Sequence, residues 1–272
     1  MAVEGSQYGY IPEEFVAIMF LVFFGISTMV HIGQATYYRM WWMLLTACQC
    51  GLGEVIGWSG RAQSSTSAEA QTLFTPSLLN FILLSWIVTR LGPCYSRLAP
   101  PWYAIILLSC DSVALVIQCT GSGIVSNGNT MSTANLGANI MLAGIVVQFV
   151  TIITYCTFAA IFLRRYLKDH PVRSSPNDRG VLDPKLRTLI VAVACSTLLL
   201  SIRCIYRIIQ LATGWTGRII QTEAYFDVFD GAMVLLAMVT FNLAHPGRLL
   251  LRRTHGAKTS STQTSLITQV DV

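Results

Sequence analysis

The sequence predicts an all-α, polytopic membrane protein with a bundle of seven transmembrane helices, and three observations lead to this prediction. Of the 272 residues, 53% are hydrophobic and only 11% are charged, whereas soluble domains carry about 25% charged residues. The apolar residues form runs of about 20, the length that a helix needs to cross a bilayer. So few charges cannot cover a soluble core, which excludes a soluble enzyme, a nucleic-acid-binding protein and a disordered chain.

The seven predicted spans are separated by connections rich in Gly, Ser, Asn and Pro. They cover Phe15–Tyr37, Trp41–Gly60, Gln71–Leu91, Trp102–Gly121, Leu136–Leu163, Thr188–Thr213 and Ala224–Ala244. The first span is too long for the apolar core of a signal peptide and follows no basic residue, so we expect it to remain. The fifth is long enough to tilt or to project beyond the bilayer.

The expected organisation has three parts. Residues 1–14 form a short extracytoplasmic N-terminus, and residues 15–247 form the seven-helix transmembrane domain. Residues 248–272 form a cytoplasmic tail that is first basic and then rich in Ser and Thr, a composition typical of disorder.

The lysines and arginines predict the orientation, because basic residues concentrate in cytoplasmic loops. Fourteen of the 18 lie in the tail or in the connections after spans one, three and five, counting Arg90 at the end of span three, while two lie in other connections. The N-terminus is therefore expected outside and the C-terminus in the cytoplasm. The basic 5–6 connection and tail should attract anionic lipids of the inner leaflet, and we expect no nucleic-acid partner.

The cysteines give no indication of a metal or cofactor. All eight lie within or beside apolar runs, where cysteine packs as a small hydrophobic residue. Cys48 and Cys50 have no second Cys or His pair that would complete a zinc site. We therefore expect no metal, no cofactor and no catalytic residue.

The informative residues are ionisable side chains inside the predicted spans. Each costs about 2.5–3.5 kcal/mol at mid-bilayer, so such groups must pair, line water or be neutralised. There are six of them: Glu54, Asp111, Arg203, Arg207, Asp227 and Asp230.

Spans six and seven each carry their charges at helical spacing. Arg203 and Arg207 are one turn apart, and Asp227 and Asp230 follow Glu223 along one face. The short connection between these spans makes them antiparallel neighbours. We therefore expect both arginines to meet both aspartates in the outer half of the bundle.

Other polar residues share helical faces on spans two and four. Glu54 and Arg61 lie on one face of span two, and Asp111 and Gln118 on one face of span four. If the four acids join the two arginines, the cluster has a formal charge of −2, which suits an amphiphile with a cationic head. The alternative is a satisfied ion-pair network that only fixes helix register.

These residues also carry a family resemblance. The chain resembles the fungal lipid-translocating exporters named for resistance to aminocholesterol, the RTA-like family, from the first span to Gly247. Each motif is weak alone, but their order over seven spans is specific. They are Tyr10-x-Pro12, His31, Glu54-x-x-Gly57-Trp58-x-x-Arg61, Asp111-x6-Gln118-x2-Gly121, Gly137-x6-Gly144-x3-Gln148, Arg203-x-x-Tyr206-Arg207, Glu223, Phe229-Asp230 and Asn242-x-x-His245-Pro246-Gly247.

Two positions depart from the family pattern. The family usually has Glu where this chain has Gln210, and Tyr where it has Asp227. We hypothesise that Asp227 replaces the missing counter-ion of Arg207.

The resemblance implies a translocator or exporter of amphiphilic lipids or lipophilic toxins, with cationic, sphingoid-base-like amphiphiles favoured. It implies no enzyme activity, a role in resistance to drugs or lipid stress, and a place in the plasma membrane, with the vacuolar membrane as alternative. The chain also has no phosphate-binding loop for ATP. The implied polar cluster is Glu54, Arg61, Asp111, Gln118, Gln148, Arg203, Arg207, Glu223, Asp227 and Asp230, supported by His31, Tyr206, Asn242 and His245.

The main alternative is a seven-span receptor or lipid-stress sensor without transport activity. The chain has neither the Asp-Arg-Tyr nor the Asn-Pro-x-x-Tyr motif of G-protein-coupled receptors. A retinal protein would need a lysine in span seven, and Lys168, Lys185 and Lys258 all lie in connections or the tail. An intramembrane zinc hydrolase needs several inward histidines, whereas only His31 lies well inside a span.

Overall fold

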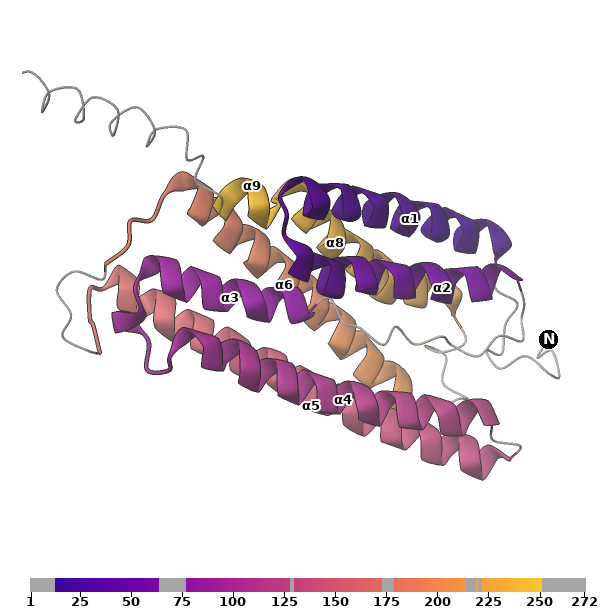
Figure 1. Ribbon diagram of the computed structural model, residues 1–272. Helices are drawn as coiled ribbons and strands as arrows, with labels where there is room; N and C mark the ends of the chain where they lie inside the picture. The colour runs from indigo at the N-terminus through magenta and orange to yellow at the C-terminus, as the bar shows by residue number, and fades with distance from the viewer. Residues whose placement is uncertain are drawn as a thin grey trace, which may run out of the picture.

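The computed structural model describes residues 13–63, 77–127, 130–172, 179–213, 219 and 222–250, whose regular elements are all helical and include no strand (Figure 1). Several predicted features lie outside these residues: the N-terminus up to residue 12, the start of the third predicted span, Arg173, Arg218 and the tail beyond residue 250. The helical elements are α1 (Glu14–Tyr37), η1 (Trp41–Met43), η2 (Leu44–Cys48), α2 (Gln49–Gln63), α3 (Ser77–Leu91), η3 (Pro93–Tyr95), α4 (Pro100–Asn127), α5 (Met131–Leu167), α6 (Pro184–Ala212), α7 (Glu223–Phe226), η4 (Asp227–Ala232), α8 (Met233–Leu243) and α9 (Pro246–Leu250).

Five stretches of the described chain are long and apolar enough to cross a membrane: α1, α4, α5, α6 and the continuous run Glu223–Leu249. They coincide with predicted spans one, four, five, six and seven. At 37 residues, α5 is about 55 Å long, so it exceeds the roughly 30 Å hydrocarbon core, as expected for span five.

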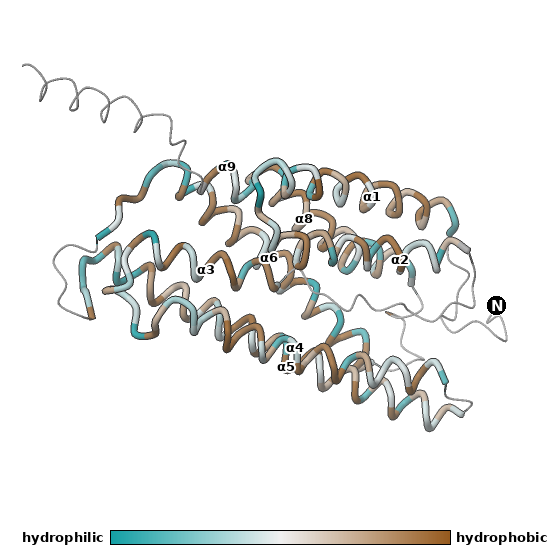
Figure 2. Tube along the Cα trace, viewed as in Figure 1, coloured by the Kyte–Doolittle hydropathy of each residue, from teal (hydrophilic) through white to brown (hydrophobic). Residues whose placement is uncertain are grey.

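The second and third predicted spans have a different character. The second begins with a 3₁₀ turn, η1, and a π turn, η2, which run directly into α2. The third is described from Ser77 onward, as the 15-residue apolar helix α3. Figure 2 shows hydrophobic colour along much of the long helices and hydrophilic colour at many of their connections.

The long helices run roughly alongside one another, and α4 and α5 lie side by side over most of their length (Figure 1). One end of the bundle holds the start of α1, the end of α2, the end of α4 and the start of α5; we call it the Glu14 end. The other holds the end of α1, the start of α4 and the start of α6; we call it the Tyr37 end.

Glycines explain the close packing of α4 against α5. A Cβ on Gly121 would lie 2.7 Å from the Gly137 carbonyl oxygen, and a Cβ on Gly137 would lie 2.7 Å from that of Gly121. A Cβ on Gly144 would lie 2.9 Å from the Ala114 carbonyl oxygen. The two backbones therefore touch, as small residues permit in membrane helices.

Polar contacts join two connections at the Tyr37 end. The Tyr95 hydroxyl donates to Asp169 at 2.5 Å, and Arg179 forms an ion pair with the same carboxylate at 2.7 Å. The hydrogen bond to Asp169 raises the pKa of Tyr95, since losing the proton would place an anion beside a carboxylate. These contacts link the chain after α3 to the chain on both sides of the α5–α6 connection.

Candidate functional site

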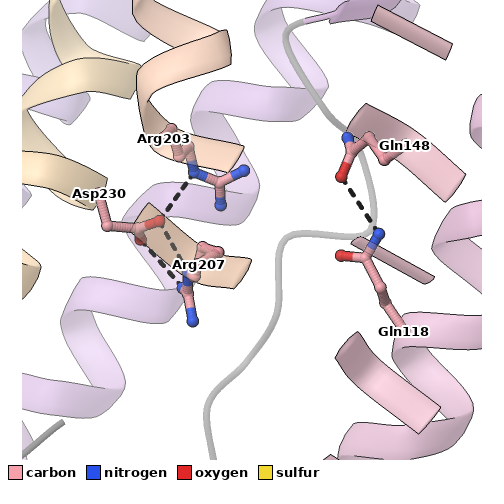
Figure 3. Close-up of polar contacts among 5 residues, drawn as sticks. All are labelled: Gln118, Gln148, Arg203, Arg207 and Asp230. Atoms are coloured by element: carbon pink, nitrogen blue, oxygen red, sulfur yellow. Dashed lines mark hydrogen bonds and ion pairs between the residues drawn. The ribbon is translucent and has the colours of Figure 1, made fainter. Parts of the chain in front are cut away.

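Asp230 is the buried centre of an ion triad between α6 and η4. Its carboxylate accepts hydrogen bonds from Arg207 Nε at 2.8 Å and Nη2 at 3.0 Å (Figure 3). Arg203 Nε lies 2.9 Å from Asp230 Oδ1, and Asp230 is only 5% exposed. Such bidentate arginine–carboxylate pairs are strong and directional. The expected meeting of span six with span seven therefore occurs, with Asp230 as the acid.

A π turn sets the position of Asp230. Residues Asp227–Ala232 form η4, between the short helix α7 and α8. π turns shift helical register and are frequent at functional sites. Gly231 lets this turn approach α2, because a Cβ there would lie 2.6 Å from the Trp58 ring.

Glu54 adds a second acid to the triad. It is buried on α2, is hydrogen-bonded by the Trp58 side chain, and lies within electrostatic range of Arg203, Arg207 and Asp230. The resulting group of Glu54, Asp230 and the two arginines is formally neutral. The excess of −2 that the sequence suggests would require Asp111 and Asp227, which lie in separate groups.

Asp227 lies in a layer closer to the Glu14 end. Its charged neighbours are Glu223, Arg61 and Glu13, and it is only partly buried. Arg207 is instead hydrogen-bonded to Asp230. The structure therefore differs from the hypothesis that Asp227 is the counter-ion of Arg207, because the π turn breaks the simple helical spacing on which that hypothesis depended.

Arg61 organises this layer at the Glu14 end. Its Nη2 atom lies 3.5 Å from Glu223 Oε1, and its guanidinium lies 4.3 Å from the Phe226 ring centroid. Glu223 also accepts a hydrogen bond from the backbone N–H of Glu13. The layer thus ties the start of α1 to the end of α2 and to α7.

Asp111 belongs to a third polar group, beside α3. It is fully buried and accepts a hydrogen bond from the Ser77 hydroxyl at 3.0 Å. It also lies within electrostatic range of Cys204, the neighbour of Arg203 on α6. Asn80 donates to the Ser196 hydroxyl at 3.3 Å one turn along α3. Ser77 and Asn80 carry no charge, so the pattern of ionisable residues does not single them out, although their i, i+3 spacing at the start of an apolar helix is a detectable signal.

Gln118 and Gln148 pair between α4 and α5. The Gln118 amide nitrogen donates to Gln148 Oε1 at 3.1 Å. Figure 3 shows this pair on the opposite side of the view from Asp230, with the Arg203 guanidinium directed toward that side. The two predicted glutamines therefore come together, apart from the ion triad.

The predicted supporting residues divide between two regions. Tyr206 stacks on Phe229 beside the triad, with ring centroids 5.8 Å apart. His31 instead hydrogen-bonds to the Met238 carbonyl at 3.1 Å, and the Asn242 amide nitrogen donates to Ser27 Oγ at 2.7 Å. These contacts join α1 to α8 nearer the Tyr37 end.

His245 lies between α8 and α9, at the Tyr37 end. Its ring stacks on Tyr38 with centroids 5.1 Å apart, and its Nδ1 atom accepts a hydrogen bond from the Gly247 N–H at 3.1 Å. His245 thus lies in the break between α8 and α9, just before Pro246 and Gly247, and it also packs against the end of α1 through Tyr38.

Comparisons with known proteins agree on one family. A family profile described as RTA1 like protein matches residues 47–253. The sphingoid long-chain base transporter RSB1 of Saccharomyces cerevisiae is 27% identical over 293 aligned residues, covering 90% of this chain and 75% of the yeast protein. No solved structure matches the chain.

Two further fungal relatives have similar identity. The lipid-translocating exporter-like protein RTA1 of Leptosphaeria maculans is 26% identical, covering 93% of this chain and 53% of that protein. The probable lipid transporter atnI of Emericella nidulans is 25% identical, covering 91% of this chain and 69% of that protein.

Proposed function

The chain belongs to the RTA1-like family, and from this premise we propose that it translocates or exports amphiphilic lipids or lipophilic toxins without hydrolysing ATP. The names of three fungal relatives, each a lipid transporter or exporter, support a lipid as the cargo. The observation that carries the proposal is the buried charge of the bundle. Glu54, Arg203, Arg207 and Asp230 lie together within apolar helices, where ionisable groups are expensive and most often functional.

We further propose seven spans with the N-terminus outside. The run Trp41–Gln63 and the third predicted span, of which α3 is the described part, would supply the two crossings beyond the five long apolar helices. The basic residues at the Tyr37 end, among them Arg97, Lys168 and Arg248, support placing that end in the cytoplasm. The ion triad then lies in the outer half of the bundle, and the plasma membrane is the proposed location.

The cargo we favour is an amphiphile with a cationic head. Two carboxylates lie beside α6: Glu54 is within electrostatic range of Arg203, and Asp111 of the adjacent Cys204. An ammonium head passing along α6 would exchange contacts with these carboxylates.

A groove of about 320 Å³ between α3, α5 and α6 supports the same cargo class. Its lining is almost entirely apolar, including Leu84, Ile87, Phe162 and Val193, and it extends along α6 to Ser201. Ser201 lies one helical turn before Cys204, which is within electrostatic range of Asp111. A hydrocarbon tail in this groove would therefore keep its polar head near the Asp111 carboxylate. A hydrocarbon tail that moves from the bilayer into this groove gains little hydrophobic free energy, because the bilayer is equally apolar. Any preference for the groove must therefore come from van der Waals packing.

The test is a flux assay in ATP-free vesicles containing the purified protein. A tail-labelled sphingoid base should cross faster than in protein-free vesicles and faster than its N-acetylated, uncharged counterpart. Asp111→Asn should slow the charged substrate about tenfold, a barrier change near 1.4 kcal/mol. Ser112→Ala, on the exposed side of the same helix, is the matched control.

Two other results would count against the proposal. Flux equal to that of protein-free vesicles, together with saturable binding of the sphingoid base, would favour the alternative, a receptor or lipid-stress sensor. Equal flux of the charged and acetylated substrates would reject the cationic-head preference while leaving translocation in place.

A further inference from the structure

A polar cavity lies at the Tyr37 end, far along α8 from the ion triad. Its volume is about 390 Å³, and it opens between the last turn of α1 and the junction of α8 with α9. Its polar and aromatic lining consists of Gln34, Tyr37, Tyr38, Asn242, His245 and Arg248. The proposed transport of a cationic amphiphile does not involve this cavity.

Two amide oxygens supply unused acceptors. The Gln34 amide nitrogen donates to the Asn242 carbonyl at 2.9 Å, and the Asn242 amide nitrogen donates to Ser27 Oγ. These bonds fix both amide groups. Gln34 Oε1 and Asn242 Oδ1 are then buried without a hydrogen-bond partner among the residues that the structure describes. Buried polar atoms of this kind normally have a partner.

His245 supplies an unused donor. Because Nδ1 accepts the Gly247 N–H, the neutral ring carries its proton on Nε2. The residue is 1% exposed, and Nε2 has no hydrogen-bond partner within the described ranges. Stacking on Tyr38 holds the ring in place. Arg248 is the one charged residue in the described lining of the cavity, and it is positive.

The cavity lies at the level expected for lipid headgroups. It is formed by the last residues of α1 and α8, where long apolar helices end. Tyr37 is 80% exposed at its edge, and exposed aromatic residues at helix ends are typical of the membrane interface. A membrane lipid can therefore reach the cavity from the bilayer.

We propose that this cavity binds the aminoalkyl phosphate head of a membrane phospholipid, of the phosphoethanolamine type. The phosphate would accept from His245 Nε2 and Arg248, and the ammonium would donate to Gln34 Oε1 and Asn242 Oδ1. This arrangement gives each unused atom of the lining a partner of the right polarity. The site does not involve the transported substrate, so this proposal can be tested separately from the proposed function.

The test is lipid retention by the purified full chain in detergent, measured by native mass spectrometry. The probes are dioleoylphosphatidylethanolamine, dioleoylphosphatidylcholine and dioleoylglycerol. We expect phosphatidylethanolamine to be retained best, because the quaternary ammonium of phosphatidylcholine has no N–H to donate. Dioleoylglycerol, with the same chains and no phosphate, should be retained least. Free O-phosphoethanolamine should displace the phospholipid if the head alone is recognised.

Two variants test the two halves of the site. Arg248→Gln, an exposed change, should weaken retention of both phospholipids about fivefold. Arg97→Gln removes the same charge at the same end of the bundle and should change nothing. Gln34→Met should remove the preference for phosphatidylethanolamine over phosphatidylcholine, with thermal stability measured alongside.

The proposal is overturned if dioleoylglycerol is retained as well as phosphatidylethanolamine, because the acyl chains alone would then explain binding. It is also overturned if Arg248→Gln and Arg97→Gln behave alike, or if no probe is retained and the cavity holds only water.

Discussion

At the scale of single residues, Asp230 determines whether two part-buried arginines are tolerated inside the bundle. Its carboxylate contacts both Arg203 and Arg207. Removing a charge from water costs desolvation free energy, which only well-oriented ion pairs and hydrogen bonds offset. Removing one partner leaves the remaining charges without this compensation. Asp227, three residues earlier, is less buried and lies beside Glu223, so the two aspartates should respond differently to the same change.

We expect Asp230→Asn to destabilise the protein by about 3–5 kcal/mol, the range for breaking a buried ion pair. Asp227→Asn should leave stability unchanged or slightly higher, because it relieves repulsion from Glu223. Thermal unfolding of the detergent-solubilised variants, followed by tryptophan fluorescence, measures both. Equal losses for the two variants would contradict the assignment of Asp230 as the central counter-ion.

A double-mutant cycle identifies the partner of Arg207. Combining Arg207→Met with Asp230→Leu should give a coupling free energy of about 1–3 kcal/mol, as expected for residues in direct contact. Combining Arg207→Met with Asp227→Leu should be additive within about 0.5 kcal/mol. Coupling to Asp227 alone would restore the hypothesis that the structure does not support.

At the scale of elements, the closest helix pair is α4 with α5, where backbone meets backbone at three glycines. Gly123 lies on the exposed side of α4, and a Cβ there would meet nothing within 4 Å. The helix therefore contains both crowded glycines and a matched open one.

We expect Gly121→Ala and Gly137→Ala each to destabilise the fold by about 1–3 kcal/mol, the usual range for overpacking a tight contact. Gly123→Ala should instead stabilise by up to about 1 kcal/mol, because alanine favours a helix more than glycine does. Unfolding midpoints in one detergent compare the three variants. A loss at Gly123 as large as at Gly137 would show that helix packing is not the cause.

At the scale of the whole molecule, polar and charged side chains cluster toward both ends of an apolar bundle. The ion triad and the Arg61–Glu223 layer lie toward the Glu14 end, while the cavity beside His245 lies at the Tyr37 end. If the bundle crosses the membrane as proposed, the two regions face opposite leaflets. The orientation then decides which lipid surface each region meets.

Single introduced cysteines test that orientation. A membrane-impermeant maleimide applied to intact cells should label Asn127→Cys, at the Glu14 end, and should label Lys168→Cys only after permeabilisation. Both positions are exposed, and the wild-type chain, with its eight free thiols, provides the baseline. The reverse pattern would place the N-terminus in the cytoplasm.

The sequence by itself determined the helical membrane class, five of the long apolar helices, the family, and the expectation that Arg203 and Arg207 meet an acidic residue of span seven. The length of an apolar run and the spacing of charges within it depend only on residues close together in the sequence, so the sequence alone predicts them. Only the tertiary structure decided that Asp227 and Asp111 lie outside the triad, that Ser77 meets Asp111, and that His245 closes a polar cavity. These outcomes depend on a π turn and on helix neighbours distant in sequence, which no local periodicity encodes.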